Sequence, residues 1–306
     1  MAISAKDVME LRKQTDCGMM ECKKALTEAD GNFEKAIEIL RERGLATAAK
    51  KAGRIAAEGM VYADYCPECK VGVVIEVNAE TDFVAKNDKF VDFVKKATKV
   101  IMEQNPADVE TLMNCKMGDE TVDQALKELI LVIKENIKVR RFTRYEGVCS
   151  AYVHGGGTHG ILVNFETTNG IEAKDEFVAY GKDIAMQVAA ANPSYVDEAS
   201  VPAEVVAKEK EIRLVQMSQD PKNANKPEAV KQKMIEGKIK KFFKENCLVD
   251  QEFVKDGDLS VAQYTAKVAK DLGGDIKIVK FARFQKGEGL EKRADDFAAE
   301  VASMVK

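Results

Sequence analysis

The sequence predicts an α+β protein with a three-helix module, a core of two α+β subdomains with an antiparallel sheet, a protruding helical hairpin and a C-terminal helix. Three observations predict this class. Residues 1–45 have only helical periodicity, residues 59–199 alternate between strand-like and helical periodicity, and residues 200–246 contain two strongly charged helical arms. A length of 306 residues suits two folded bodies with appendages.

Composition narrows the classes of function. Hydrophobic residues make up 45%, enough for a sizeable core, and charged residues make up 32%, which favours long solvated helices. Lys and Arg number 47 against 51 Asp and Glu, a net charge of −4. No global field therefore attracts nucleic acid or an anionic membrane, and we expect neither as a partner. No run approaches 18 apolar residues, so we expect no membrane span.

Cysteine and histidine usage indicates the compartment and limits the chemistry. Seven cysteines, an odd number scattered through a long chain, argue against a disulfide framework and favour a reducing compartment. The N-terminus lacks an apolar signal core and an Arg/Ser-rich transit pattern, so we expect a cytoplasmic protein. The two histidines, His154 and His159, are too few for a histidine-rich metal centre.

The first module, residues 1–45, is predicted to be three short helices around a small core, a typical binding module. Ser4 and Asp7 resemble a capping box at the first helix start. The second helix is expected at 19–29, and the third is expected to end at Gly44, a natural left-handed cap. Residues 46–58 are rich in Ala and Lys and are interpreted as a linker.

The first core subdomain, residues 59–146, begins with alternating Val73, Ile75 and Val77, a strand pattern. A partner strand precedes it across the Cys66–Cys69 turn. Thr121 and Gln124 form a capping box ahead of a helix. The other expected elements are a helix at 87–102 and a strand at 139–145.

The second core subdomain comprises residues 147–199 and 247–284. Its expected elements are strands at 148–153, 161–166 and 276–284 and a helix ending before Pro193. The order of elements suggests two related halves on one antiparallel sheet.

Residues 200–246 are predicted to be a coiled-coil hairpin. Arms at 203–218 and 228–244 flank a turn at 220–227, and each arm projects about 25 Å. Val205 and Ile212 lie a heptad apart on the first arm. The seam of the second arm is expected at Met234, Ile235, Ile239 and Phe242. Residues 285–306 form a C-terminal helical module with an amphipathic helix at 291–305.

The glycine-rich segment at 154–160 (HGGGTHG) contains two short motifs, one found in esterases and one found in nucleotide-binding proteins. It lacks the context that either motif requires. Its His-Gly-Gly-Gly has no accompanying Gly-x-Ser-x-Gly nucleophile elbow. Its Gly-x-Gly-x-x-Gly at 155–160 is followed by a strand pattern, whereas pyrophosphate binding requires a following helix N-terminus. We expect a hairpin loop here and no bound nucleotide.

Cys66 and Cys69 could supply half of a zinc knuckle or a redox pair. Tetrahedral zinc needs four ligands, and no second Cys-x-x-Cys or Cys-x-x-His completes the set. A plain or incidentally oxidisable turn is the favoured interpretation. The sequence also offers no catalytic constellation of Ser, His, Cys and Asp, so we expect neither a catalytic residue nor a metal or cofactor.

Asp82 and Phe83 place a large apolar ring beside a charge in the connection from a strand to a helix. From the pattern alone, the ring either folds back into the core or anchors an interface, where buried aromatic side chains dominate the binding energy. Both alternatives remain open at this point.

Residues 15–26 (TDCGMMECKKAL) and 76–85 (EVNAETDFVA) closely resemble the two signatures of the elongation factor Ts family. The resemblance is collinear over the chain and continues at 135–137, 140–141, 152–155, 236–238, 253–254, 287–289 and 296–301. It implies a guanine-nucleotide exchange factor for elongation factor Tu in bacterial-type translation. It also implies a small UBA-like N-terminal module, two core subdomains, a coiled-coil hairpin and a C-terminal helical module.

The resemblance also implies which residues contact the partner. Asp82 and Phe83 match a pair that enters the GTPase domain of elongation factor Tu, where the ring wedges between two helices and disturbs the Mg²⁺ site. The further partner-binding or supporting positions are Thr81, Val84, Lys23, Ile133, His154, Val254 and Met304.

The chain departs from the family pattern at Lys134, where many members have glycine, in the loop after His154 and at Gln251-Glu252. A homodimer, or an assembly of two copies of each protein through the hairpin, stays open. The competing interpretation is a translation-associated binding protein or chaperone without exchange activity.

Overall fold

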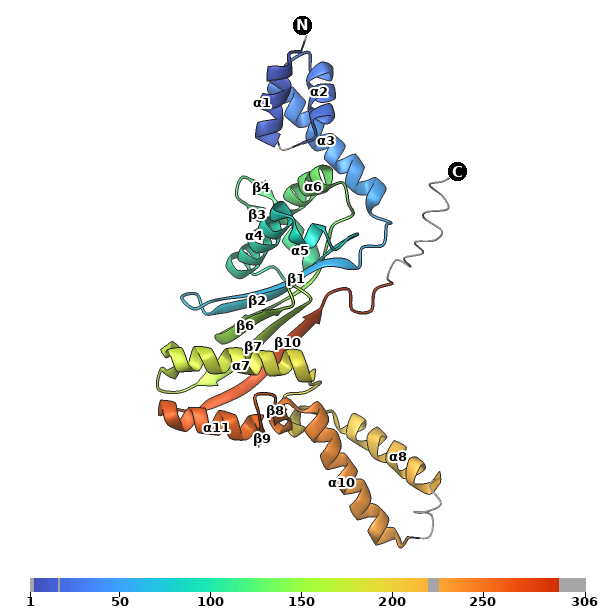
Figure 1. Ribbon diagram of the computed structural model, residues 1–306, viewed down its shortest axis with the longest axis vertical. Helices are drawn as coiled ribbons and strands as arrows, with labels where there is room; N and C mark the ends of the chain where they lie inside the picture. The colour runs from blue at the N-terminus through green and yellow to red at the C-terminus, as the bar shows by residue number, and fades with distance from the viewer. Residues whose placement is uncertain (1–2, 16, 220–225, 292–306) are drawn as a thin grey trace.

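The computed structural model describes residues 3–15, 17–219 and 226–291. Figure 1 shows an elongated molecule with the N-terminal helices at one end, two layers of sheet in the middle and a helical hairpin at the other end. In the described ranges, no helix has the length and apolar character needed to cross a membrane. The α+β class predicted from the sequence is confirmed.

The N-terminal module consists of α1 (Ala5–Thr15), α2 (Met19–Glu28) and α3 (Phe33–Lys51). The capping box is present, because Asp7 N–H donates to Ser4 Oγ at 3.2 Å and Ser4 N–H donates to Asp7 Oδ2 at 3.0 Å.

The predicted end of the third helix at Gly44 is wrong, since α3 continues for seven further residues. The stretch after Gly44 (LATAAKK) contains no helix breaker, so nothing stops propagation there. A Cβ at Gly44 would lie 3.3 Å from the carbonyl oxygen of Lys127. Glycine therefore serves close packing of α3 on the neighbouring helix α6 (Val122–Ile133) rather than a cap.

The first half of the core is an antiparallel sheet of order β1-β2-β5 covered by helices. The predicted strands, the helix near 87–102 and the Thr121–Gln124 capping box are all present. Its elements are β1 (Glu58–Cys66), β2 (Val71–Ala79), α4 (Asp88–Gln104), α5 (Val109–Asn114), β3 (Lys116–Met117), β4 (Glu120–Thr121), α6 and β5 (Lys138–Glu146).

The second half is an antiparallel sheet of order β10-β7-β6. Its elements are β6 (Val148–His154), β7 (His159–Thr167), α7 (Asp175–Ala191), β8 (Glu252–Phe253), β9 (Asp256–Ser260), α11 (Val261–Leu272) and β10 (Ile276–Gln285). Helix α11 was not predicted from the sequence. A capping box between Ser260 and Gln263 marks its start, and Gly273 in the left-handed conformation marks its end.

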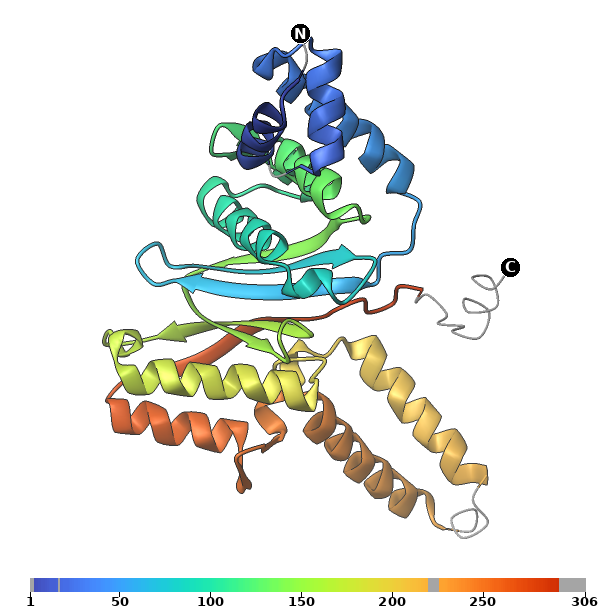
Figure 2. The same cartoon turned by 45° about the horizontal axis from the view of Figure 1, so that its top comes forward.

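The expectation of one continuous sheet is wrong, because the halves form two three-stranded sheets packed face to face. Figures 1 and 2 show helices α4 to α6 outside the first sheet and α7 with α11 outside the second. Glycines permit the close approach of the sheets. A Cβ at Gly72 would lie 2.5 Å from Leu162 Cδ1, and one at Gly160 would lie 2.4 Å from Val61 Cγ1. Side chains at these positions would force the sheets apart.

The hairpin consists of α8 (Ala203–Gln219) and α10 (Glu228–Asn246). Its seam is formed by Met217, Ile235 and Ile239, with Val206, Met234 and Phe243 partly buried. The predicted seam of the first arm is therefore wrong: Ile212 is 40% exposed. Heptad spacing fixes the period of a seam but not its phase, which the partner helix selects. Most of the predicted turn and the predicted helix at 291–305 lie outside the described residues.

Candidate partner-binding site

The loop that joins β2 to α4 presents Phe83 on the surface. Its side chain is 79% exposed, and the adjacent Asp82 is also exposed. The alternative in which Phe83 folds back into the core is therefore wrong. A single exposed apolar side chain is common on protein surfaces. What distinguishes Phe83 is how firmly the loop that carries it is held.

Val84 anchors the loop from below. It is 5% exposed, belongs to the core of the first half, and begins a 3₁₀ turn, Val84–Lys86. Asn87 then caps α4 by accepting a hydrogen bond from Lys89 N–H at 3.0 Å. The residue after Phe83 takes the core position, and Phe83 is consequently directed outward.

Glu135, in the turn after α6, braces the loop from the side. Thr81 donates to its carboxylate twice, from the backbone N–H at 3.0 Å and from Oγ1 at 2.7 Å. Hydrogen bonds to an ionised acceptor are stronger than neutral ones. Both residues are half-buried, so water screens these contacts only in part.

A second carboxylate, that of Glu80, ties the loop to the same turn. Its Oε1 accepts a hydrogen bond from Asn136 N–H at 2.6 Å, and Arg54 lies 3.4 Å away. Asn136 Nδ2 donates in turn to the carbonyl oxygen of Arg54 at 2.7 Å. The segment before β1, the loop after β2 and the turn after α6 are thus joined in one polar network. Phe83 is displayed on a loop that needs little ordering on binding.

A buried charge cluster holds the end of β10 against the first sheet. Glu76 is fully buried and pairs with Arg140 at 3.0 Å and Arg141 at 2.7 Å. It also accepts hydrogen bonds from Gly287 N–H at 2.8 Å and from Asn78. Burial alone would raise the pKa of Glu76, but these hydrogen bonds outweigh burial and lower it. The cluster thereby holds Gly287, two residues after the end of β10, against the first sheet.

Ile133 is half-buried in the last turn of α6, two residues before Glu135. Lys134 has φ +64°, a left-handed conformation in which glycine carries no steric penalty. The backbone therefore keeps the shape that glycine would adopt.

His154 lies exposed at the end of β6, and its Nδ1 is 3.0 Å from the Tyr152 hydroxyl. The turn that follows contacts β1, since Val61 N–H donates to the carbonyl oxygen of Gly157 at 2.8 Å. Because Glu58 pairs with Ala79, this turn and the Phe83 loop lie at the same end of the two sheets.

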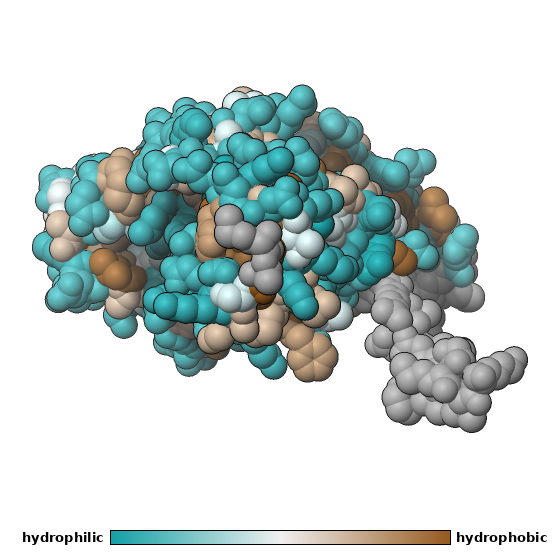
Figure 3. All heavy atoms as spheres, turned by 90° about the horizontal axis from the view of Figure 1, so that it is seen from above, coloured by the Kyte–Doolittle hydropathy of each residue, from teal (hydrophilic) through white to brown (hydrophobic). Residues whose placement is uncertain are grey.

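The remaining predicted residues lie on other elements. Lys23 is exposed on α2, beside the exposed Met19 and Met20. Figure 3, viewed from the end with the N-terminal helices, shows a mainly hydrophilic face with separate apolar spots. Val254 is 50% exposed, and its N–H donates to the buried Gln187 at 2.8 Å. Met304 lies outside the described residues.

The glycine-rich segment forms the turn of the β6–β7 hairpin, as predicted. His154 pairs with His159, and the three glycines between them all have positive φ. The strand β7 follows the loop, so no helix N-terminus is placed behind it as in a pyrophosphate-binding motif. Burial and the neighbouring Arg283 lower the pKa of His159.

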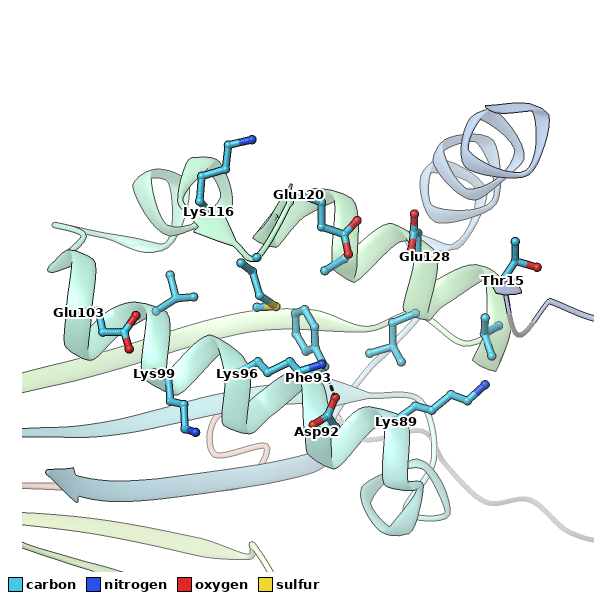
Figure 4. A pocket seen from close by; sticks show the side chains of 16 residues that line it. Thr15, Lys89, Asp92, Phe93, Lys96, Lys99, Glu103, Lys116, Glu120 and Glu128 are labelled. Atoms are coloured by element: carbon cyan, nitrogen blue, oxygen red, sulfur yellow. Dashed lines mark ion pairs between the residues drawn. The ribbon is translucent and has the colours of Figure 1, made fainter. Parts of the chain in front are cut away.

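A surface pocket of about 460 Å³ lies between α4, α6 and the short strands β3 and β4 (Figure 4). Its lining carries charges of both signs, and Asp92 pairs with Lys96 at 2.8 Å. Burial, together with repulsion from Glu128, raises the pKa of Glu120 at its rim. In the part of the chain that the structure describes, no group of three His, Cys, Asp or Glu could hold a metal ion.

An exposed aromatic ring on a braced loop is a feature typical of proteins that act by binding a partner. A family model described as Elongation factor TS matches residues 80–288. Elongation factor Ts of Clostridium perfringens is 48% identical over 307 residues, covering 99% of each chain. That of Syntrophotalea carbinolica is 47% identical over 311 residues, covering 100% of each. The chain belongs to the elongation factor Ts family, the nucleotide exchange factors of elongation factor Tu in translation elongation.

The sequence identified the exposed pair but not its supports. Glu135 and Asn136 stand out in the sequence only through the family resemblance, and no pattern predicts a bracing role for Glu80 or Arg54. The bracing partners are 54 and 56 residues apart in the chain, so no local pattern links them.

Proposed function

We propose that Phe83 is the wedge with which this chain opens the nucleotide site of elongation factor Tu. The observation that carries the proposal is the 79% exposure of Phe83 on a loop held by Val84, Glu80 and Glu135. A rigid, exposed aromatic side chain loses little conformational freedom when it enters a partner's pocket. Aromatic anchors of this kind dominate interface energies.

Exchange follows from linkage alone. If the chain binds the nucleotide-free partner more tightly than the GDP·Mg²⁺ form, GDP must bind correspondingly less tightly to the complex. A wedge that displaces Mg²⁺ removes charge neutralisation from the β-phosphate, which weakens GDP further. No proton transfer or covalent step is required, so we assign the chain no catalytic residue and do not class it as an enzyme.

The other predicted residues either position Phe83 or make further contacts with the partner. Asp82 flanks the wedge with a charge, while Thr81 and Val84 fix its direction. Lys23 and Met304 belong to a contact made by the terminal modules. Ile133, His154 and Val254 complete the partner surface of the core.

We further propose the division of the chain that the sequence suggests. The chain would act in the cytoplasm and would comprise a binding module at 1–45, a linker at 46–58, core subdomains at 59–146 and at 147–199 with 247–284, a hairpin at 200–246 and a terminal module at 285–306. The first six residues of the linker continue helix α3. The hairpin would supply a second partner surface or join two copies of the complex.

The test is stopped-flow release of labelled GDP from elongation factor Tu, with and without this chain. We expect Phe83→Ala to lower the saturating release rate at least about tenfold, since losing an aromatic anchor costs about 2 kcal/mol or more. Val178→Ala, which truncates a 61% exposed side chain on α7, is the matched control and should leave the rate unchanged.

Melting temperature separates the two outcomes for Phe83. An exposed side chain contributes little to stability, so the variant should melt like the parent chain. Normal GDP release by Phe83→Ala would contradict the proposal. Binding to elongation factor Tu without any GDP release would instead support a chaperone-like partner protein.

A further inference from the structure

Cys66 and Cys69 form a disulfide in the turn between β1 and β2, and the proposed exchange function does not use it. The other five cysteines are free. Four of them are buried and one is half-buried: Cys17, Cys22, Cys149, Cys247 and Cys115. Cys69, by contrast, is exposed. The pair is therefore the sulfur site most accessible to a reagent in water.

We propose that this pair is a reversible thiol–disulfide exchange site for low-molecular-mass thiols. The sulfur of Cys69 is the atom that the incoming thiolate attacks, and the sulfur of Cys66 is the leaving group. The inference concerns a modification of the chain and does not rest on the wedge function of Phe83.

Accessibility and hydrogen bonding both favour attack on the sulfur of Cys69 and departure of the sulfur of Cys66. Cys69 is exposed, whereas Cys66 is half-buried and packs against the core of the first half. Cys69 N–H donates to Cys66 Sγ at 3.2 Å. A hydrogen bond to the leaving sulfur stabilises the negative charge that develops there, and a better leaving group departs faster.

The neighbouring Glu68 disfavours the negative charge that develops on the sulfur of Cys66. The Glu68 carboxylate oxygen lies 3.6 Å from Cys66 Sγ. It repels a thiolate at Cys66, so it slows departure of that sulfur. Removing the carboxylate should therefore speed reduction, which gives the mechanism a directional test.

The reaction balances with two molecules of the thiol. The first thiolate bonds to Cys69 Sγ while the Cys66–Cys69 bond breaks, and the electron pair goes to Cys66 Sγ. A second thiolate attacks the reagent sulfur of the mixed disulfide and releases Cys69 as a thiolate. Two thiols are oxidised to one external disulfide, the protein disulfide is reduced to two thiols, and the two protons of the reagents pass to the cysteines.

The turn is held by contacts that do not involve the disulfide, which makes the reaction reversible. Cys66 pairs with Val71 in the β1–β2 register. Gly147 N–H donates to the carbonyl oxygen of Lys70 at 2.8 Å, and Lys70 Nζ lies 3.6 Å from Glu172. After reduction these contacts keep the two sulfurs close, so an external disulfide can reform the bond.

The site is also distant from the proposed wedge. The disulfide precedes β2 and the Phe83 loop follows it, at opposite ends of a nine-residue strand. At about 3.3 Å per residue the two are roughly 30 Å apart. Reduction should therefore leave GDP release unchanged within about twofold.

The experiment follows thiols by alkylation and intact mass under native conditions. After treatment with oxidised glutathione, we expect a digest to contain a peptide with Cys66 and Cys69 joined. Reduced glutathione should then make these two cysteines, but not Cys149 or Cys247, available to iodoacetamide. Protection of the buried cysteines shows that the protein has stayed folded.

Single variants identify the attacked sulfur. Cys66→Ser should retain a glutathione adduct on Cys69, while Cys69→Ser should form an adduct on Cys66 at least about tenfold more slowly, because Cys66 is less exposed. Glu68→Gln should speed reduction of the intact pair severalfold, and Cys115→Ser is the control that changes neither rate.

Three results would overturn the inference. The first is an absence of any Cys66–Cys69 crosslink after oxidation of the folded chain. The second is reduction that occurs only after denaturation. The third, equal adduct rates in the two single variants, would refute the assignment of Cys69. A chain inactive in GDP release that still exchanges thiols would leave this inference standing and refute only the proposed function.

Discussion

The brace between Thr81 and Glu135 gives a sharp quantitative prediction. Glu135→Ala removes both hydrogen bonds that Thr81 donates, at 3.0 and 2.7 Å, and leaves the Thr81 N–H without this acceptor. A hydrogen bond to a charged group contributes about 1.5–3 kcal/mol, and the half-buried setting favours the lower end. We therefore expect the braced conformation of the loop to lose about 2–3 kcal/mol of stability relative to its unbraced conformations. Fewer molecules should then hold the loop in the braced conformation.

The kinetic signature follows from that population. When only a fraction of molecules is competent to bind, the apparent dissociation constant rises in inverse proportion to that fraction. We expect the concentration giving half-maximal GDP release to rise at least about tenfold in Glu135→Ala. The saturating release rate should stay near that of the parent chain, because Phe83 is intact. This pattern is the opposite of that expected for Phe83→Ala.

Two substitutions at Thr81 serve as matched controls. Thr81→Ser keeps the hydroxyl and should remain within about twofold of the parent chain. Thr81→Val loses the 2.7 Å bond alone and should raise the half-maximal concentration about fivefold, as expected for about 1 kcal/mol. The Thr81→Val effect should largely vanish in the Glu135→Ala background. Additive effects, or unchanged release by Glu135→Ala at an unchanged melting temperature, would refute the brace.

Three further predictions concern stability and the hairpin. Replacing 204–244 with a short Gly/Ser loop should leave the core folded and GDP release active, because Ser194 N–H donates to the Asn246 carbonyl at 2.9 Å and keeps the hairpin ends together. Loss of GDP release by the folded variant, or unfolding of its core, would contradict this. Glu76→Gln should destabilise the chain by about 3 kcal/mol at neutral pH in urea unfolding. The lowered pKa of Glu76 means that its contribution is present above the ordinary value of 4.5 and is lost as pH falls through the folded value, so the parent and variant should converge in acid. Gly160→Ala should cost about 1–3 kcal/mol, since its Cβ would lie 2.4 Å from Val61, whereas Gly257→Ala meets nothing within 4 Å and should be neutral.

Local pattern accounts for most of the secondary structure. Alternation at Val73, Ile75 and Val77 predicted β2, and the capping box at Thr121 predicted the start of α6. These signals are local because strands repeat every two residues and helices every 3.6. The same reasoning missed α11, although Ser260 and Gln263 carry its capping box.

Tertiary packing decided the features that no repeating sequence pattern specifies, namely which strands pair, what Gly44 does and which residues of α8 face its partner helix. Strand alternation gives the apolar face of each strand but not its partner, so one sheet was expected where two pack together through Gly72 and Gly160. Gly44 was interpreted as a cap, yet its role is to let α3 approach Lys127 on α6. The seam of α8 was expected at Ile212, but the neighbouring helix α10 selected Met217 instead.

The sequence by itself determined the class of the fold, the family resemblance and the identity of the Asp82–Phe83 pair. Its periodicity did not determine whether Phe83 is inside or outside, because a single apolar residue in a loop belongs to no repeating pattern. Only the family resemblance implied that the ring enters a partner. The tertiary structure decided that point: Val84 fills the core beneath the loop, and Glu135, from a turn 54 residues further along the chain, holds Thr81. Two residues so far apart in the chain are brought within hydrogen-bond distance only when the sheet and α6 pack together.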